Sequence, residues 1–488
     1  MKKLKVMKSL SIISVIVFLS VILVSCGKKF IDLPPISSVS VDLIYKTDKD
    51  FLDALTATYN THQQQYQNFY IFGDIRGDDS WQSIYKNNSW SFSDAFVINS
   101  SDPLMHSTWQ NYYQAIFRIN TILEKIQAAD VSVVKNKDRY IAEAKFLRAL
   151  SYFDLVRIFG AVPMITTPVT IEEGYKVGRE TVDNIYSKII IPDFLAAENG
   201  LPLKYAGSDV GRPTKGAATS LLGRVYLTLK DFPKAETKLQ EVTKMGYALL
   251  PNYNDLFDYT KNEHHSEYIY DIEYEQGMGE GSRLTNAFAP NSQPFTTFFG
   301  IGGNGDEQNS PTPGLINLFD PKDKRRDITV GVSGGFYNRD SVFIKLATNT
   351  NQTYTKKYIT PVAVINDSRA NWKVIRYADV LLMYAEALNE NGKTAEALGY
   401  LNQVRTRAGL PGVPNLTKEA TRDRIYLERR LELSFEGVRW FDLLRTGQAY
   451  SVMQKDGMLP YMVVFPIPLS QIQLINNSKI FPQNEGYN

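Results

Sequence analysis

Residues 376–409 read RYADVLLMYAEALNENGKTAEALGYLNQVRTRAG. Apolar residues recur in this stretch at spacings of three and four, which is the period of an α-helix with one buried face. This stretch therefore predicts a pair of helices that pack against each other.

The spacing within residues 378–409 fits the 34-residue tetratricopeptide pattern, in which small residues let two helices approach and larger ones fill the gap between them. A second stretch, residues 214–246, fits the same pattern independently. Because one such pair cannot bury its apolar face alone, we expect several units to stack into a solenoid. The matching positions are Leu222, Gly223, Tyr226, Ala235 and Leu239 in the first unit, and Leu381, Tyr384, Ala385, Leu388, Ala397, Leu401 and Val404 in the second.

Helical periodicity extends on both sides of these units, over about 105–247 and 371–447. Between them, about 268–370, glycine, asparagine and proline are frequent, and Tyr268–Glu275 alternates like a strand. The sequence thus predicts a mainly α protein. Residues 41–488 would form a single body, a tetratricopeptide-like helical solenoid with a loop-rich, minor-β lobe.

Composition excludes several classes of function. The 488 residues carry 54 Lys+Arg against 52 Asp+Glu, so no excess of basic charge supports general nucleic-acid binding. A single cysteine permits neither an internal disulfide nor a cysteine-rich metal site.

The amino terminus predicts a lipoprotein. Residues 1–25 combine early lysines with a short apolar run, as signal peptides do, and Leu23-Val24-Ser25-Cys26 follows as in a bacterial lipobox. We expect Cys26 to carry the lipid. Residues 26–40 would form a polar tether between the membrane and the body.

The chain shows no catalytic motif. Its histidines, at positions 62, 106, 264 and 265, have no zinc-binding spacing, and Gly300–Gly305 matches a dinucleotide-binding string without the required strand and helix. Two groups of acids, Asp78-Asp79 and the set Asp271, Glu273 and Glu275, offer oxygen ligands or a glycosidase pair, although solvation or ion pairing is the simpler interpretation. We predict no catalytic residue, no metal site and no cofactor, and leave a structural calcium ion open.

Residues 73–92, GDIRGDDSWQSIYKNNSWSF, are the strongest candidate for ligand binding. Flat rings beside amide and charged groups suit sugar recognition, because a ring stacks on the sugar while polar groups bond its hydroxyls. The alternative is that these rings fix the loop to the helical body. A phenylalanine cluster in the Gly-rich segment has the same two interpretations. The candidate residues are Asp78, Asp79, Trp81, Tyr85, Asn88 and Trp90, with Phe295, Phe298 and Phe299.

Several motifs in this order resemble the SusD/RagB family of Bacteroidetes outer-membrane nutrient-binding lipoproteins. They run from the lipobox at Cys26 to the closing QNEGY at 483–487, and so cover nearly the whole chain. Besides 376–389 and 397–409, the motifs are AEAKFLRALSYFDLVR at 142–157, ERRLELSFEGVRWFDLLRTG at 428–447 and FPIP at 465–468.

The resemblance implies a lipid-anchored protein on the exterior of the outer membrane. It would sit as a lid on a SusC-like TonB-dependent barrel, bind glycan fragments and pass them to that barrel, while members similar to RagB handle peptides. The matching motifs do not include the family's ligand residues, so the candidate site rests on the aromatic loop alone. A glycoside hydrolase and a protein-binding scaffold remain the alternatives from other classes.

The segment 428–447 predicts a helix that ends at Gly437, followed by a short helix through Trp440 and Leu443. We expect Trp440 in the core. The glutamates and arginines of this segment would join solenoid units to one another.

Overall fold

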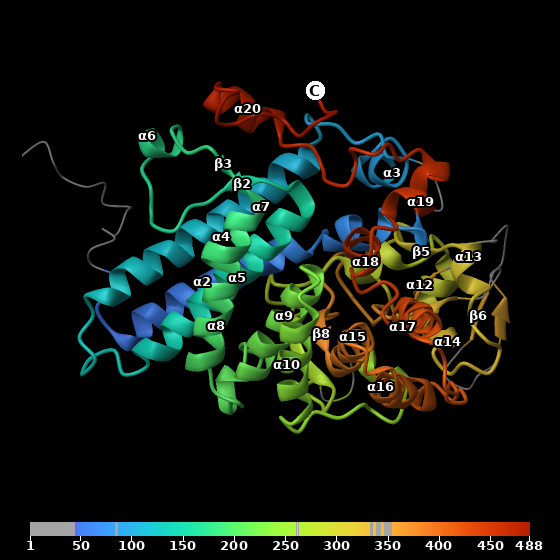
Figure 1. The fold of residues 1–488 in the computed structure, drawn as a ribbon. Coiled ribbons are helices and arrows are strands. Elements are labelled where there is room, and N and C mark those ends of the chain that lie inside the picture. The colour runs from blue at the N-terminus through green and yellow to red at the C-terminus, as the bar shows by residue number, and fades with distance from the viewer. Residues whose placement is uncertain are drawn as a thin grey trace, which may run out of the picture.

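A computed structural model describes residues 44–82, 86–259, 261, 263–331, 335–337, 343–345 and 354–488. The predicted signal peptide, Cys26 and the tether lie outside the described residues, as does Tyr85. Figure 1 shows a mainly helical body, and the predicted fold class is confirmed.

Nine helices form a continuous array in which each helix packs against the next, except that α16 and α17 both pack on α15 (Figure 1). This order places the two predicted units side by side, because α10 of the first contacts α15 of the second. The helices are α2 (Asp48–Tyr66), α4 (Pro103–Gln127), α5 (Lys137–Phe159), α8 (Ile191–Gly200), α9 (Lys215–Thr228), α10 (Phe232–Thr243), α15 (Tyr377–Glu390), α16 (Thr394–Arg407) and α17 (Lys418–Glu432).

The tetratricopeptide positions are buried as predicted. Leu222, Leu239, Leu381 and Leu401 are inaccessible to solvent. At the close approach between α9 and α10, a Cβ added to Gly223 would lie 2.5 Å from a methyl carbon of Leu239. A larger residue at position 223 would crowd Leu239. The small residue of the tetratricopeptide pattern therefore allows the close helix approach that the sequence predicts.

Short elements connect and cover the array. The helical ones are η3 (Ile71–Ile75), α3 (Ser89–Asp94), α6 (Ile171–Gly174), α7 (Val182–Ile185), η4 (Tyr186–Ile190), η5 (Gly207–Asp209), η6 (Tyr253–Leu256), α11 (Leu284–Phe288), α12 (Gln293–Phe299), α13 (Pro313–Ile316), α14 (Arg326–Thr329), α18 (Arg439–Arg445), α19 (Ala449–Met453), η7 (Gln454–Asp456) and α20 (Leu469–Ile475).

Strands are few and short, in agreement with the predicted minor-β content. Within the described residues they form four antiparallel pairs. These are β1 (Ser80–Trp81) with β5 (Ser310–Pro311), β2 (Val162–Pro163) with β3 (Arg179–Glu180), β4 (Tyr268–Ile272) with β8 (Trp372–Arg376), and β6 (Gly335–Tyr337) with β7 (Phe343–Lys345).

Buried ion pairs join the carboxy-terminal helices to the rest of the body. Arg376, at the end of β8, donates to Glu267, Glu432 and Glu436. Arg407 of α16 donates to two of the same carboxylates, those of Glu267 and Glu432. The glutamates of the 428–447 segment therefore connect separate units, as predicted, and Trp440 is fully buried as expected.

The helix predicted to reach Gly437 ends earlier, at Glu432. The backbone then turns sharply, with φ of 65° at Phe435 and 71° at Gly437. This turn crosses η3 closely, because a Cβ on Gly73 would lie 2.3 Å from the Gly437 carbonyl oxygen. After the helix the chain passes closely against η3, a contact that the helical period alone did not reveal.

Candidate functional site

The candidate loop and the Gly-rich segment meet through the pairing of β1 with β5. Trp81 lies opposite Ser310. The Thr312 backbone N–H donates to the Asp79 carbonyl oxygen at 3.0 Å, and the Thr312 hydroxyl donates to the Asp78 carbonyl oxygen at 2.9 Å. Two segments more than two hundred positions apart in sequence thus form one surface, which we call the aromatic loop face: residues 78–82 and 86–94 with 283–312.

Trp81 presents its ring to solvent and Trp90 is held in place. The Trp81 side chain is 40% exposed, whereas Trp90 is half-buried. The indole Nε1 of Trp90 donates to the Tyr70 hydroxyl at 2.9 Å, and the Arg283 guanidinium lies 5.0 Å from the center of the Trp90 ring. Trp81 therefore has the free surface that stacking on a sugar requires, while Trp90 anchors the loop.

Asn88 caps the helix that carries Trp90. Its side-chain oxygen accepts from the Ser91 backbone N–H at 3.1 Å, which satisfies one of the unpaired donors at the start of α3. Tyr85, between the two tryptophans, lies outside the described residues.

Asp78 and Asp79 face arginines of the carboxy-terminal motif. Arg430 donates to both carboxylates and Arg439 donates to Asp78 at 2.7 Å. Burial alone would raise the pKa of Asp78, but the hydrogen bond and charge of Arg439 bring it below the ordinary value. Burial keeps the pKa of Asp79 above its ordinary value despite these arginines. Both carboxylates thus tie the aromatic loop to the helical body, which is the ion-paired interpretation given above.

The three phenylalanines have different surroundings. Phe295 is fully buried in a small separate core with Ile301 and Tyr354. Phe298, at the end of α12, is 42% exposed, and its ring meets that of Phe299 edge-on at 4.9 Å. Phe298 is therefore the member of this cluster that offers most ring surface at the aromatic loop face.

The other candidate groups serve the fold. His62 is buried, which lowers its pKa to about 3, and the pKa of Asp271 is raised to about 6 by burial beside Lys373. Glu273 contacts His264 at 2.7 Å. In the part of the chain that the structure describes, no group of three His, Cys, Asp or Glu side chains could hold a metal ion.

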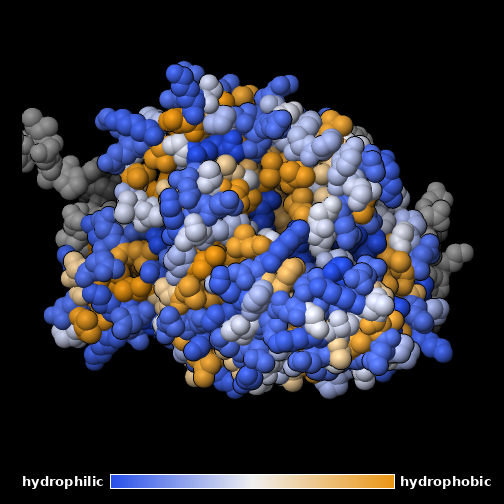
Figure 2. Space-filling view, in the orientation of Figure 1, coloured by the Kyte–Doolittle hydropathy of each residue, from blue (hydrophilic) through white to orange (hydrophobic). Residues whose placement is uncertain are grey.

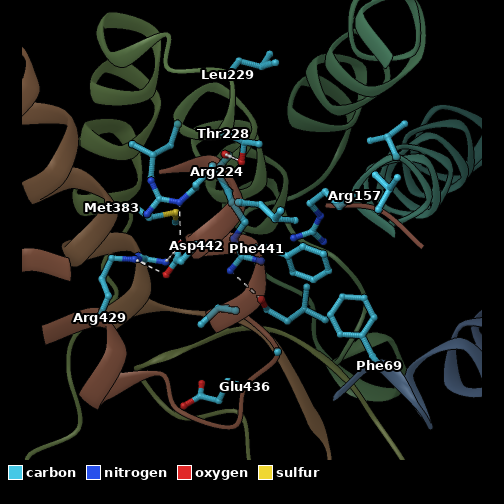
Figure 3. Close-up of a pocket in the computed structure, with 18 of the residues that line it drawn as sticks. Phe69, Arg157, Arg224, Thr228, Leu229, Met383, Arg429, Glu436, Phe441 and Asp442 are labelled. Atoms are coloured by element: carbon cyan, nitrogen blue, oxygen red, sulfur yellow. Dashed lines mark hydrogen bonds and ion pairs between the residues drawn. The ribbon is translucent and has the colours of Figure 1, made fainter. Parts of the chain in front are cut away.

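A cavity of about 330 Å³ lies elsewhere in the molecule, among α5, α9, β8, α15 and α18. A hollow bordered by hydrophobic side chains is visible near the center of the face shown in Figure 2, and Figure 3 shows the lining residues. We call it the central cavity. Its walls include Phe69, Trp372 and Phe441, together with the arginines Arg157, Arg224, Arg429 and Arg445.

Sequence reasoning missed the residues that position Trp90 and the whole central cavity. No sequence pattern links Arg283 or Tyr70 to Trp90, because these contacts form only when the chain folds. The cavity lining likewise comes from short pieces of many elements.

Comparison with known protein families shows to which family the chain belongs. A family model described as the SusD family matches residues 232–487. This is more than half of the chain. The chain belongs to the SusD family. A second model, described as "Starch-binding associating with outer membrane", matches residues 29–227, so the predicted family membership is confirmed.

SusD-family relatives match along most of their length. The SusD-like protein P25 of Formosa agariphila is 28% identical, over 95% of this chain and 96% of its own. The starch-binding protein SusD of Bacteroides thetaiotaomicron is 25% identical, over 72% of this chain and 73% of its own.

Solved structures of SusD-like proteins share the fold. A laminarin-binding SusD-like protein superposes with a TM-score of 0.77 and 30% identity, over 91% of this chain and all of its own. Surface glycan-binding protein A from Bacteroides uniformis gives a TM-score of 0.76 and 26% identity, over 90% of this chain and 99% of its own. No helix among the described residues of this SusD-family chain has the length and apolarity needed to cross a membrane.

Proposed function

We propose that this protein is a non-enzymatic glycan-binding lipoprotein of the bacterial outer membrane. The observation that carries the proposal is the aromatic loop face. There an exposed Trp81 belongs to the β1–β5 pair, and ion pairs such as Arg430 with Asp79 connect this pair to the helical body. Relatives named for binding laminarin and starch support a glycan as the ligand.

Within this proposal the candidate residues divide by role. Trp81 and Phe298 contact the sugar, and Phe299 extends the same surface. Tyr85, outside the described residues, stays a candidate from the sequence alone. Trp90 and Asn88 hold the loop in shape, since their polar atoms already bond to Tyr70 and Ser91. Asp78, Asp79 and Phe295 support the face from the interior, because their side chains are committed to arginines or to the core.

We also propose that lipid on Cys26 anchors the protein to the outer membrane, exposed to the exterior, and that it delivers ligand to a SusC-like TonB-dependent barrel. The family model associated with the outer membrane supports this location. Co-purification of a barrel protein with this chain from solubilised outer membranes tests the partnership, and isolation of the chain alone under the same mild conditions would argue against it.

Calorimetric titration of the purified protein tests ligand class. We expect saturable heat from β-glucan or α-glucan oligosaccharides, no heat from peptides of similar mass, and no release of reducing sugar. Binding of peptides alone would replace the glycan with a peptide ligand. Sugar release would make the protein a hydrolase.

The Trp81→Ala variant tests the face itself. Loss of the stacking ring should weaken oligosaccharide binding about tenfold or more, because a central aromatic contact contributes more than about 1 kcal/mol. Tyr175→Ala is the matched control, since Tyr175 is 44% exposed next to α6, which Figure 1 shows far from α3. Equal affinity of both variants and the unaltered protein would place the glycan elsewhere.

A further inference from the structure

The central cavity is separate from the aromatic loop face and has no part in the proposed glycan binding. Its volume of about 330 Å³ lies at the lower end of the range of small-molecule sites. Figure 3 shows Leu229 at one end of the lining and Glu436 at the other. Leu229 and Val463 are each 40% exposed and form part of an apolar mouth.

Arg157 is a fixed cation in the cavity wall. Its guanidinium lies between the rings of Phe153, at 3.9 Å, and Phe441, at 4.2 Å. Nε donates to the Phe153 carbonyl oxygen and Nη2 to Asp154. No described residue accepts a hydrogen bond from Nη1, so this rigid group retains an unused donor.

Two further residues of the wall, Arg224 and Trp372, carry donors without protein acceptors. Arg224 donates through Nη2 to the Val374 carbonyl oxygen and to Asp379, but nothing in the described chain accepts from its Nε or Nη1. Trp372 is 1% exposed, and its indole N–H likewise finds no acceptor among the described residues. These donors of the wall have no protein acceptor, so they favour a ligand that accepts hydrogen bonds.

The carboxylates of the wall, Asp442 and Glu436, already accept hydrogen bonds from protein groups. Asp442 receives hydrogen bonds from Arg429 and Arg445. Glu436 receives them from Arg376 and Lys357, both buried. The cavity therefore offers unused donors among apolar walls, and a ligand rich in hydroxyl donors, such as a sugar, would find few acceptors there.

We propose that the central cavity is a second binding site, for a small carboxylic acid with an apolar body of roughly a dozen non-hydrogen atoms. A carboxylate only accepts hydrogen bonds and pairs well with guanidinium donors such as those of Arg157 and Arg224. The apolar body fits the walls around Phe69, Leu227 and Phe441.

Titration with 4-phenylbutyrate and with its neutral amide tests the proposal, using the purified protein and following heat or ligand-observed NMR. We expect one equivalent of the acid to bind saturably and the amide to bind at least tenfold more weakly, because only the acid pairs with the guanidinium groups. Equal affinity for the two, or no saturable binding of the acid, would overturn the proposal.

Two variants locate the binding. Leu229→Trp should close the mouth and weaken acid binding at least tenfold, whereas Leu474→Trp, an equally simple change at an exposed leucine of α20, should leave it unchanged. Arg157→Gln should weaken binding of the acid and not of the amide. If Arg157→Gln does not fold, the comparison of the two leucine variants still shows whether the acid binds in the central cavity.

The outcome of this test does not affect the glycan proposal. Oligosaccharide binding by Leu229→Trp should equal that of the unaltered protein, because Leu229 is not part of the aromatic loop face. Acid binding that persists in full in Leu229→Trp would refute the cavity site and leave the glycan site unaffected.

Discussion

Trp81 and Trp90 occupy the same loop, yet their surroundings differ. Trp90 bonds to Tyr70 and lies against Arg283, whereas Trp81 keeps 40% of its surface exposed. At the residue scale, the side chain proposed to bind a ligand is therefore distinguished by its exposed ring. Both tryptophans follow polar residues in sequence, so composition could not separate them.

Asp74 provides a prediction at the same scale. Its carboxylate accepts from the Gly437 backbone N–H at 2.9 Å and from Asn309 at 3.3 Å, and burial raises its pKa to about 8. In the unfolded chain this carboxyl ionises near pH 4. Folding therefore takes up a proton, and the free energy of unfolding falls as pH rises from about 4 to about 8, by about 1 kcal/mol per pH unit.

Asp74→Asn removes this proton uptake. Compared with the unaltered protein, the variant should lose less stability between pH 5 and pH 8, as urea unfolding at several pH values would measure. Parallel curves for the two proteins would show that Asp74 is ionised in the folded state.

At the scale of elements, the spacing of α9 and α10 depends on Gly223, which has no side chain. Gly223→Ala would bring a methyl group to 2.5 Å from Leu239, and overpacking of this kind costs about 1–3 kcal/mol. Gly399→Ala, in the middle of α16 with nothing within 4 Å of the added carbon, should instead stabilise by about 0.5–1 kcal/mol.

Thermal or urea unfolding of these two glycine variants measures the difference. The result would contradict the close approach if Gly223→Ala were as stable as Gly399→Ala.

The helical elements were predictable because their period reports a local geometry. Leu381 to Val404 repeat every three or four residues, and every one of these tetratricopeptide positions is buried. The pairing of Trp81 with Ser310 was not predictable, since two-residue strands carry no pattern and their partners lie far apart in sequence. The early end of α17 was also missed, because the turn that follows it packs against η3, a segment far away in sequence.

At the scale of the whole molecule, the same motif both builds the body and supports the site. Arg430 and Arg439 belong to the 428–447 motif, and they hold Asp78 and Asp79 beneath the aromatic loop. This family motif therefore fixes the position of the loop whose exposed residues we propose bind the ligand.

At this scale we also predict that lipid on Cys26 attaches the whole protein to the membrane. Cys26→Ala should move the protein from the outer-membrane fraction to the soluble fraction, because stable anchoring requires the acyl chains. Fractionation of cells that lack the barrel partner measures this without a second anchor. Retention of the variant in those membranes would contradict lipidation at Cys26.

The central claim is that the aromatic loop face binds a glycan, and a crystal structure of the protein with a bound oligosaccharide tests it most directly. The account predicts electron density for a sugar ring stacked on the Trp81 indole, next to the β1–β5 pair. Well-defined sugar density elsewhere on the molecule, with the Trp81 ring uncovered, would contradict it.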